Sequence, residues 1–165
     1  MKGLENSTYL LLYIISNIVA LLMWVIAWRS ARLGRLLFFL LFAWASWMNW
    51  TTAIHSPQSY MEYADLSFLN VYKQFIHGWF STHILLSVGF IASCQALIAI
   101  SLLLKGWILK TGIVAAIIFL IAIVPLGVGS GFPCTVMLAF GMYVLFHKPA
   151  QDYLWVKFVP VKRKQ

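Results

Sequence analysis

Five long apolar runs follow one another along the chain, separated by short segments that hold most of the charged residues. A helix needs about 20 mostly apolar residues to cross a bilayer, and in lipid a helix satisfies its own backbone groups. We therefore predict an all-helical integral membrane protein, a five-span bundle forming a single domain over residues 1–165. The predicted spans are approximately Thr8–Trp28, Leu36–Ile54, Trp79–Leu104, Thr111–Val128 and Pro133–Phe146.

The longest polar interruption, residues 55–78, separates the second and third runs. Ser59 and Glu62 have the spacing of a capping box, which marks the start of a helix. After them, Phe68, Val71 and Phe75 recur at helical spacing and predict an apolar stripe. We expect short amphipathic helices here, lying at the membrane face and covering one end of the spans.

Composition supports a membrane location. The chain is 62% hydrophobic and only 10% charged, whereas soluble domains are about 25% charged. The net charge of +8 comes from Lys and Arg, ten of which fall in the first and third connections and in the tail after the last span. Positive residues gather on the cytoplasmic side, so we expect a bacterial inner-membrane protein with its N-terminus outside and a basic cytoplasmic tail, residues 147–165. The bilayer explains this charge, and we expect no nucleic-acid partner.

Residues 55–83 contain two of the four acidic residues and three of the four histidines. Imidazoles and carboxylates carry protons and bind metals, so the catalytic candidates are His55, Glu62, Asp65, His77 and His83. Their spacing matches no metal-binding motif, and we predict no metal site. The alternative is that these side chains only end spans and cap helices at the interface.

Polar and aromatic side chains near this segment are candidates for binding a quinone or a lipid. They are Trp47, Asn49, Trp50, Trp79 and Gln95. The tryptophans also fit the aromatic belt at a membrane interface. Asn49 and Gln95 also fit hydrogen bonding between helices, since polar groups within spans usually face other helices.

The order of features from Arg32 to about Phe158 resembles the DoxX-like family of small four-helix membrane proteins. The matching features are the run from Arg35 to Asn49 followed by Pro57 and Tyr60, the segment FIASCQALIAISLLLKG, and the close AFGMYVLFHKPAQDYL. The resemblance implies a four-helix core with an extra N-terminal span and an association with membrane redox systems. Gln95 stands where the family commonly has an acid, and Asn49 where it commonly has a basic residue.

Three functions fit these observations. The first is an accessory or anchor subunit of a membrane complex, such as a respiratory or other redox complex, with other membrane subunits as partners and no catalytic activity of its own. The second is a quinone- or lipid-binding redox protein whose pocket lies under the 55–83 segment. The third is a membrane enzyme that acts on an apolar substrate through a His/Glu pair. A transporter is disfavoured because no inverted repeat is visible.

Overall fold

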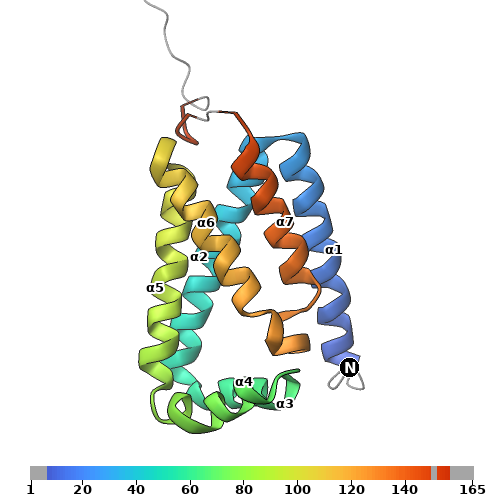
Figure 1. Ribbon diagram of the computed structural model, residues 1–165, viewed down its shortest axis with the longest axis vertical. Coiled ribbons are helices and arrows are strands. Elements are labelled where there is room, and N and C mark those ends of the chain that lie inside the picture. The colour runs from blue at the N-terminus through green and yellow to red at the C-terminus, as the bar shows by residue number, and fades with distance from the viewer. Residues whose placement is uncertain (1–6, 150–151, 157–165) are drawn as a thin grey trace, which may run out of the picture.

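The computed structural model describes residues 7–149 and 152–156, and this part of the chain is helical without strands, as predicted. Five long helices run side by side, and short helices lie across one end of them (Figure 1). The long helices are α1 (Ser7–Arg29), α2 (Ala31–His55), α5 (Ile84–Leu103), α6 (Gly106–Ala122) and α7 (Cys134–His147). The short helices are η1 (Pro57–Met61), α3 (Glu62–Leu66), α4 (Asn70–Phe75), η2 (Ile76–Phe80) and η3 (Val124–Ser130).

Three of the long helices, α1, α2 and α5, are long and apolar enough to cross a membrane. Helix α6 meets the same criterion only together with η3, from which it is bent by 80°. Helix α7 is apolar but has 14 residues, about 21 Å at ~1.5 Å per residue. Length and composition therefore make this an apolar helical protein compatible with a bilayer, with three spans or four if the bent pair counts as one.

Several helices begin or end at other residues than the predicted spans, and local interactions explain the differences. Helix α2 begins at Ala31 because the Ser30 side chain accepts a hydrogen bond from the Leu33 amide and caps it. Helix α5 begins at Ile84, after a kink at Gly78 within η2. Helix α6 ends at Ala122, ahead of Pro125, whose ring cannot continue a helix.

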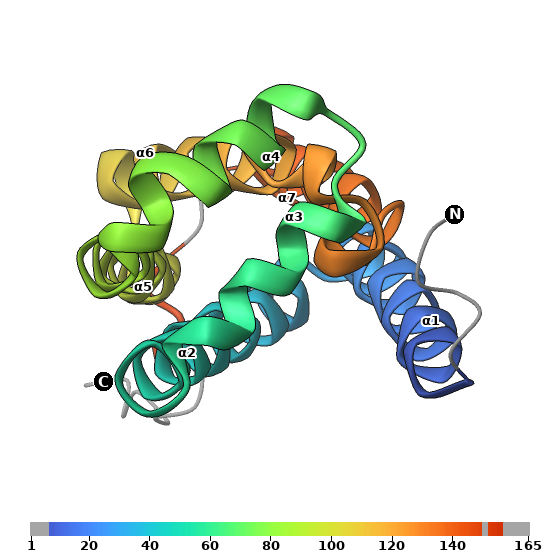
Figure 2. The same ribbon diagram turned by 90° about the horizontal axis from the view of Figure 1, so that it is seen from below.

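Helix α2 lies along α5, and α6 packs between α5 and α7. Helix α1 lies on the outside, mainly against α7, and α2, α5, α6 and α7 form the rest of the bundle (Figure 2). We call residues 57–80, which contain η1, α3, α4 and η2, the outer cap. Seen from below, the outer cap crosses from the end of α2 towards η3 and returns to α5 (Figure 2).

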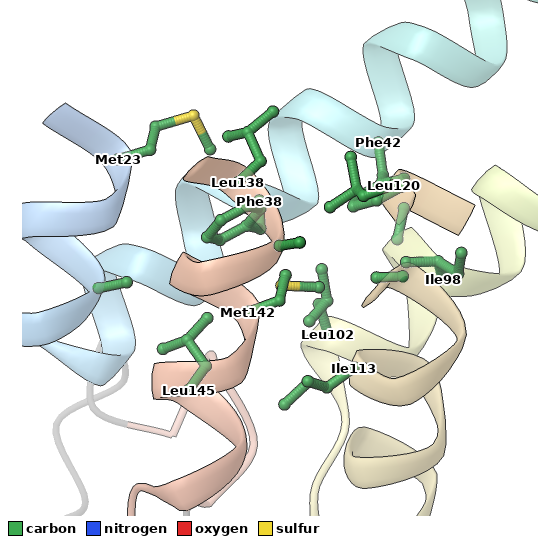
Figure 3. Packing of buried hydrophobic residues seen from close by; sticks show 14 of the residues in the cluster. Met23, Phe38, Phe42, Ile98, Leu102, Ile113, Leu120, Leu138, Met142 and Leu145 are labelled. Atoms are coloured by element: carbon green, nitrogen blue, oxygen red, sulfur yellow. The ribbon is translucent and has the colours of Figure 1, made fainter. Parts of the chain in front are cut away.

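The end of the helices away from the outer cap is tightly packed. Phe38, Leu102, Ile113 and Met142 come from four helices and point towards one another (Figure 3), and each is at most 1% exposed. At about 25 cal/mol per Å² of apolar surface, each such side chain contributes about 1.5–3 kcal/mol on burial. In a bilayer, close van der Waals packing between the helices takes over part of this role.

A buried arginine closes the same end of the molecule. Arg35 is 2% exposed, and its Nε and Nη2 both donate to the Leu102 carbonyl, at 3.0 and 2.8 Å. Nη2 also donates to the Leu104 carbonyl at 2.6 Å, and Nη1 to the Asp152 carbonyl at 2.8 Å. The last carbonyls of a helix have no partner within it, so Arg35 caps α5 and ties it to α2 and to the segment after α7.

We predict that Arg35→Met lowers the free energy of unfolding in detergent by about 1–3 kcal/mol, because buried carbonyls lose their donors. Thermal unfolding followed by circular dichroism measures the change. The matched control is Arg29→Met, since Arg29 is exposed at the end of α1. Equal melting temperatures for the two variants would contradict the role given to Arg35.

A pocket beneath the outer cap

The outer cap is fixed to the bent end of α6 by hydrogen bonds to free carbonyls. The Phe68 amide and the Ser67 hydroxyl both donate to the Pro125 carbonyl, each at 2.9 Å. The Tyr72 hydroxyl donates to the Ala122 carbonyl at 2.7 Å. Ala122 is the last residue of α6, so its carbonyl has no partner within that helix. The outer cap supplies a donor to it and two donors to the carbonyl of Pro125 in η3.

The backbones of α3 and η3 approach each other at Gly127, whose φ of +64° favours glycine. A Cβ atom there would lie 2.6 Å from the Leu66 carbonyl oxygen. Only glycine therefore lets η3 approach α3 this closely.

A pocket of about 520 Å³ lies beneath the outer cap, within the space that α2, α5, α6 and α7 surround. This volume lies in the range of small-molecule sites, about 300–1,000 Å³. Its roof includes Tyr60, Phe75 and Phe80, and Phe42 and Phe119 line its walls with their rings edge to face, 6.2 Å between centroids. The polar residues that line it are Asn49, Tyr60, Tyr63, Tyr72, Gln95, Ser130 and Thr135.

Three of these polar residues form a chain of hydrogen bonds that enters the pocket. The Tyr60 hydroxyl contacts Asn49 Oδ1 at 2.9 Å and the Asn49 carbonyl at 3.2 Å. Asn49 Nδ2 donates to Gln95 Oε1 at 2.8 Å. The chain joins the outer cap to α2 and α2 to α5, and it orders the amide of Gln95, a residue only 3% exposed.

Tyr60 is held on both sides by other rings. Its ring stacks on Tyr63, 5.9 Å between centroids, and meets Phe80 edge to face at 6.4 Å. Burial raises the pKa of the Tyr60 phenol above its ordinary value, and nearby Tyr63 raises it further. The phenol therefore stays protonated at neutral pH and remains a hydrogen-bond donor.

A second cavity, a cleft of about 580 Å³, lies between α1 and α2. Leu12, Tyr13 and Trp44 line it on the side of the long helices. Asn49 and Tyr60 border both this cleft and the pocket. These two side chains and their hydrogen bonds therefore form part of the partition between the two cavities.

The five candidate acids and histidines are all exposed, and they stay apart from the pocket lining. They are His55, Glu62, Asp65, His77 and His83. Of these, Glu62 borders the cleft. Within residues 7–149 and 152–156, no three His, Cys, Asp or Glu side chains lie close enough to hold a metal ion. The His83 ring stacks on Trp79, 4.6 Å between centroids, at the outer surface.

The five binding candidates divide into two groups. Trp47, Trp50 and Trp79 are exposed by 63%, 39% and 51%, and they line neither cavity. Asn49 and Gln95 come together at the pocket, from α2 and α5. The exposed tryptophans fit the interfacial belt that the sequence also allowed.

Sequence reasoning did not select Tyr60, Tyr72 or Thr135 as site residues. Thr135 is 3% exposed, lines the pocket, and its Oγ1 has no hydrogen-bond partner in the described part of the chain. The Tyr72 phenol donates to a backbone oxygen 50 residues along the chain, and the Tyr60 phenol contacts one 11 residues away. No local spacing indicates such contacts. Cys94 and Cys134 are both free thiols.

No protein-family model, curated protein or solved structure matches this chain.

We predict that Tyr60→Phe loosens the outer cap, because it removes the phenol that contacts Asn49 while keeping the stacked ring. Hydrogen–deuterium exchange of residues 57–80 should rise several-fold, as expected from the loss of about 0.5–1.5 kcal/mol for one hydrogen bond. Tyr143→Phe, on the exposed face of α7, should leave that exchange unchanged. Unaltered exchange in Tyr60→Phe would show that the phenol does not hold the outer cap.

Proposed function

We propose that this is an integral membrane protein that binds one apolar small molecule, a quinone or a lipid, in the pocket beneath the outer cap. The observation that carries the proposal is the pocket itself. Its walls are aromatic and aliphatic, and a few convergent polar groups lie among them, which is the usual composition of a small-molecule site.

The surroundings of the pocket suit a ligand that arrives from a bilayer. Its walls come from the long apolar helices α2, α5 and α6 and from α7. Polar groups at membrane depth usually mark a functional site when they face the protein interior. Gln95 and Asn49 meet this description, since they bond to each other across two helices.

We place the protein in a bacterial inner membrane with five spans, the N-terminus outside and the C-terminus in the cytoplasm. The count takes α6 with η3 as one bent span and α7 as a short one. The orientation depends on the ten basic residues predicted to face the cytoplasm. In this orientation the outer cap and the pocket lie on the outer side of the membrane.

The alternative function is an accessory subunit of a membrane complex, as the DoxX-like resemblance suggests. Its support is the order of features from Arg32 to about Phe158 that resembles this family. A pocket is compatible with such a subunit, because it can hold a lipid or a quinone shared with a partner.

Filling the pocket should abolish ligand binding. We predict that Ile91→Trp, in the pocket wall on α5, reduces the amount of co-purified lipid or quinone at least tenfold. Mild-detergent purification from the native membrane, solvent extraction and mass spectrometry of the extract measure that amount. The matched control is Leu97→Trp on the same helix, because Leu97 is 67% exposed.

The same preparation separates the two proposals. A stoichiometric small molecule that Ile91→Trp loses and Leu97→Trp retains supports the ligand-binding function. A stoichiometric larger protein with no small molecule in the extract supports the accessory subunit. Wild-type protein that carries neither would contradict both.

A further inference from the structure

We propose that the ligand of the pocket is an uncharged amphiphile whose head group is a carbonyl, bound by the Gln95 side-chain amide. This inference depends on the proposed function, since it assumes that the pocket holds a ligand. It specifies the chemistry of the head group, and it excludes fatty acid anions and phospholipid head groups from the pocket.

The first argument is charge. None of the described residues that line the pocket is Asp, Glu, Lys, Arg or His, and tyrosine and cysteine side chains are ordinarily neutral at pH 7. An ion that enters such a pocket loses its hydration and gains no partner of opposite charge. This desolvation costs several kcal/mol for each ion, even after relaxation, so a neutral head group is strongly favoured.

The second argument is the direction of the hydrogen-bond chain. The Tyr60 hydroxyl has one proton, and the shorter of its two contacts, 2.9 Å against 3.2 Å, is to Asn49 Oδ1, to which it donates. Asn49 Oδ1 is then the acceptor, which leaves Asn49 Nδ2 to donate to Gln95 Oε1. The order of donors and acceptors therefore fixes which end of the Gln95 amide remains free.

The free end of that amide is a donor. Gln95 Nε2 makes no hydrogen bond within the described residues, although Gln95 is 3% exposed and lines the pocket. Nε2 is not among the fully enclosed side-chain atoms that have no partner, so it keeps surface that a ligand in the pocket can reach. An acceptor on the ligand would pair with this donor, whereas a ligand with an apolar end at this place would leave it without a partner and without water.

Thr135 gives a second, independent indication. Its buried Oγ1 has no partner in the described part of the chain, and the residue lies in the pocket wall on α7. Its hydroxyl turns about a single side-chain bond, so an acceptor in the pocket can supply the missing hydrogen bond. A carbonyl oxygen has two lone pairs and can accept more than one hydrogen bond.

Binding of matched probes tests this inference. Oleamide and oleate have the same 18-carbon chain and nearly the same head-group shape, but at pH 9 only oleate is charged. Radiolabelled oleamide and oleate would be titrated into wild-type protein in phosphatidylcholine nanodiscs. We expect oleamide to saturate one site and to bind at least tenfold more tightly than oleate.

Variants test whether the preference for oleamide over oleate arises in the pocket. Gln95→Met keeps the length of the side chain and removes its N–H donors, and it should weaken oleamide binding about tenfold. Thr135→Val keeps the shape and removes the hydroxyl, and it should weaken binding less. Leu97→Met, on the exposed face of α5, should bind like the wild type.

Each adverse outcome has a separate meaning. Oleate that binds as tightly as oleamide, and is lost in Ile91→Trp, would overturn the head-group inference and leave the pocket as the ligand site. Oleamide binding that Gln95→Met does not change would also overturn it. If neither probe binds and the purified protein carries no small molecule, the ligand-binding function fails together with the inference.

Discussion

Backbone carbonyls that no helix can satisfy determine how this protein is held together. In an apolar environment an unpaired carbonyl is costly, and the long helices end where their last carbonyls need outside donors. At one end, Arg35 supplies donors to the final turn of α5. At the other end, the outer cap supplies them to the stretch after α6. These bonds fix the end of α5 to α2, and the end of α6 to the outer cap, although the joined segments lie far apart along the chain.

The two ends differ in how completely they are filled. Near Arg35, side chains from four helices interlock around Phe38 and Met142. Near the outer cap, α6 bends and α7 is short, so fewer side chains fill the space between the helices. Aromatic rings of the outer cap cover this space without filling it. The pocket is thus a consequence of where α6 breaks, and Pro125 and Gly127 determine that break.

The sequence predicts the helical character of this protein well and its site only in part. Apolar runs identified the long helices, because the period and length of such runs are local properties. The second span was predicted to begin at Leu36, which left Arg35 in the connection before it. In the structure α2 begins at Ala31, after the Ser30 cap, and Arg35 is buried. Asn49 and Gln95 were selected as polar residues within apolar runs, and they meet at the pocket.

Other parts of the site have no signature in the sequence. The histidines share one segment with Tyr60, yet the turn of η2 around Gly78 leaves His77 and His83 on the outer surface. The role of Tyr60 depends on the contact of Asn49 with Gln95, 46 residues along the chain, and that of Thr135 on the helices that pack around the pocket. Spacing cannot reveal such contacts, because they are fixed by tertiary structure alone.

The hydrogen bonds that hold the outer cap also bear on how a ligand would enter or leave the pocket. If the outer cap swung open, the carbonyls of Ala122 and Pro125 would lose three hydrogen bonds, each worth about 0.5–1.5 kcal/mol. A sideways movement of the Tyr60 side chain would break its contacts with Asn49 and with the rings of Tyr63 and Phe80, and it would join the pocket to the cleft between α1 and α2. Of the two movements, that of Tyr60 breaks fewer hydrogen bonds, so we expect the ligand proposed above to exchange through the cleft between α1 and α2.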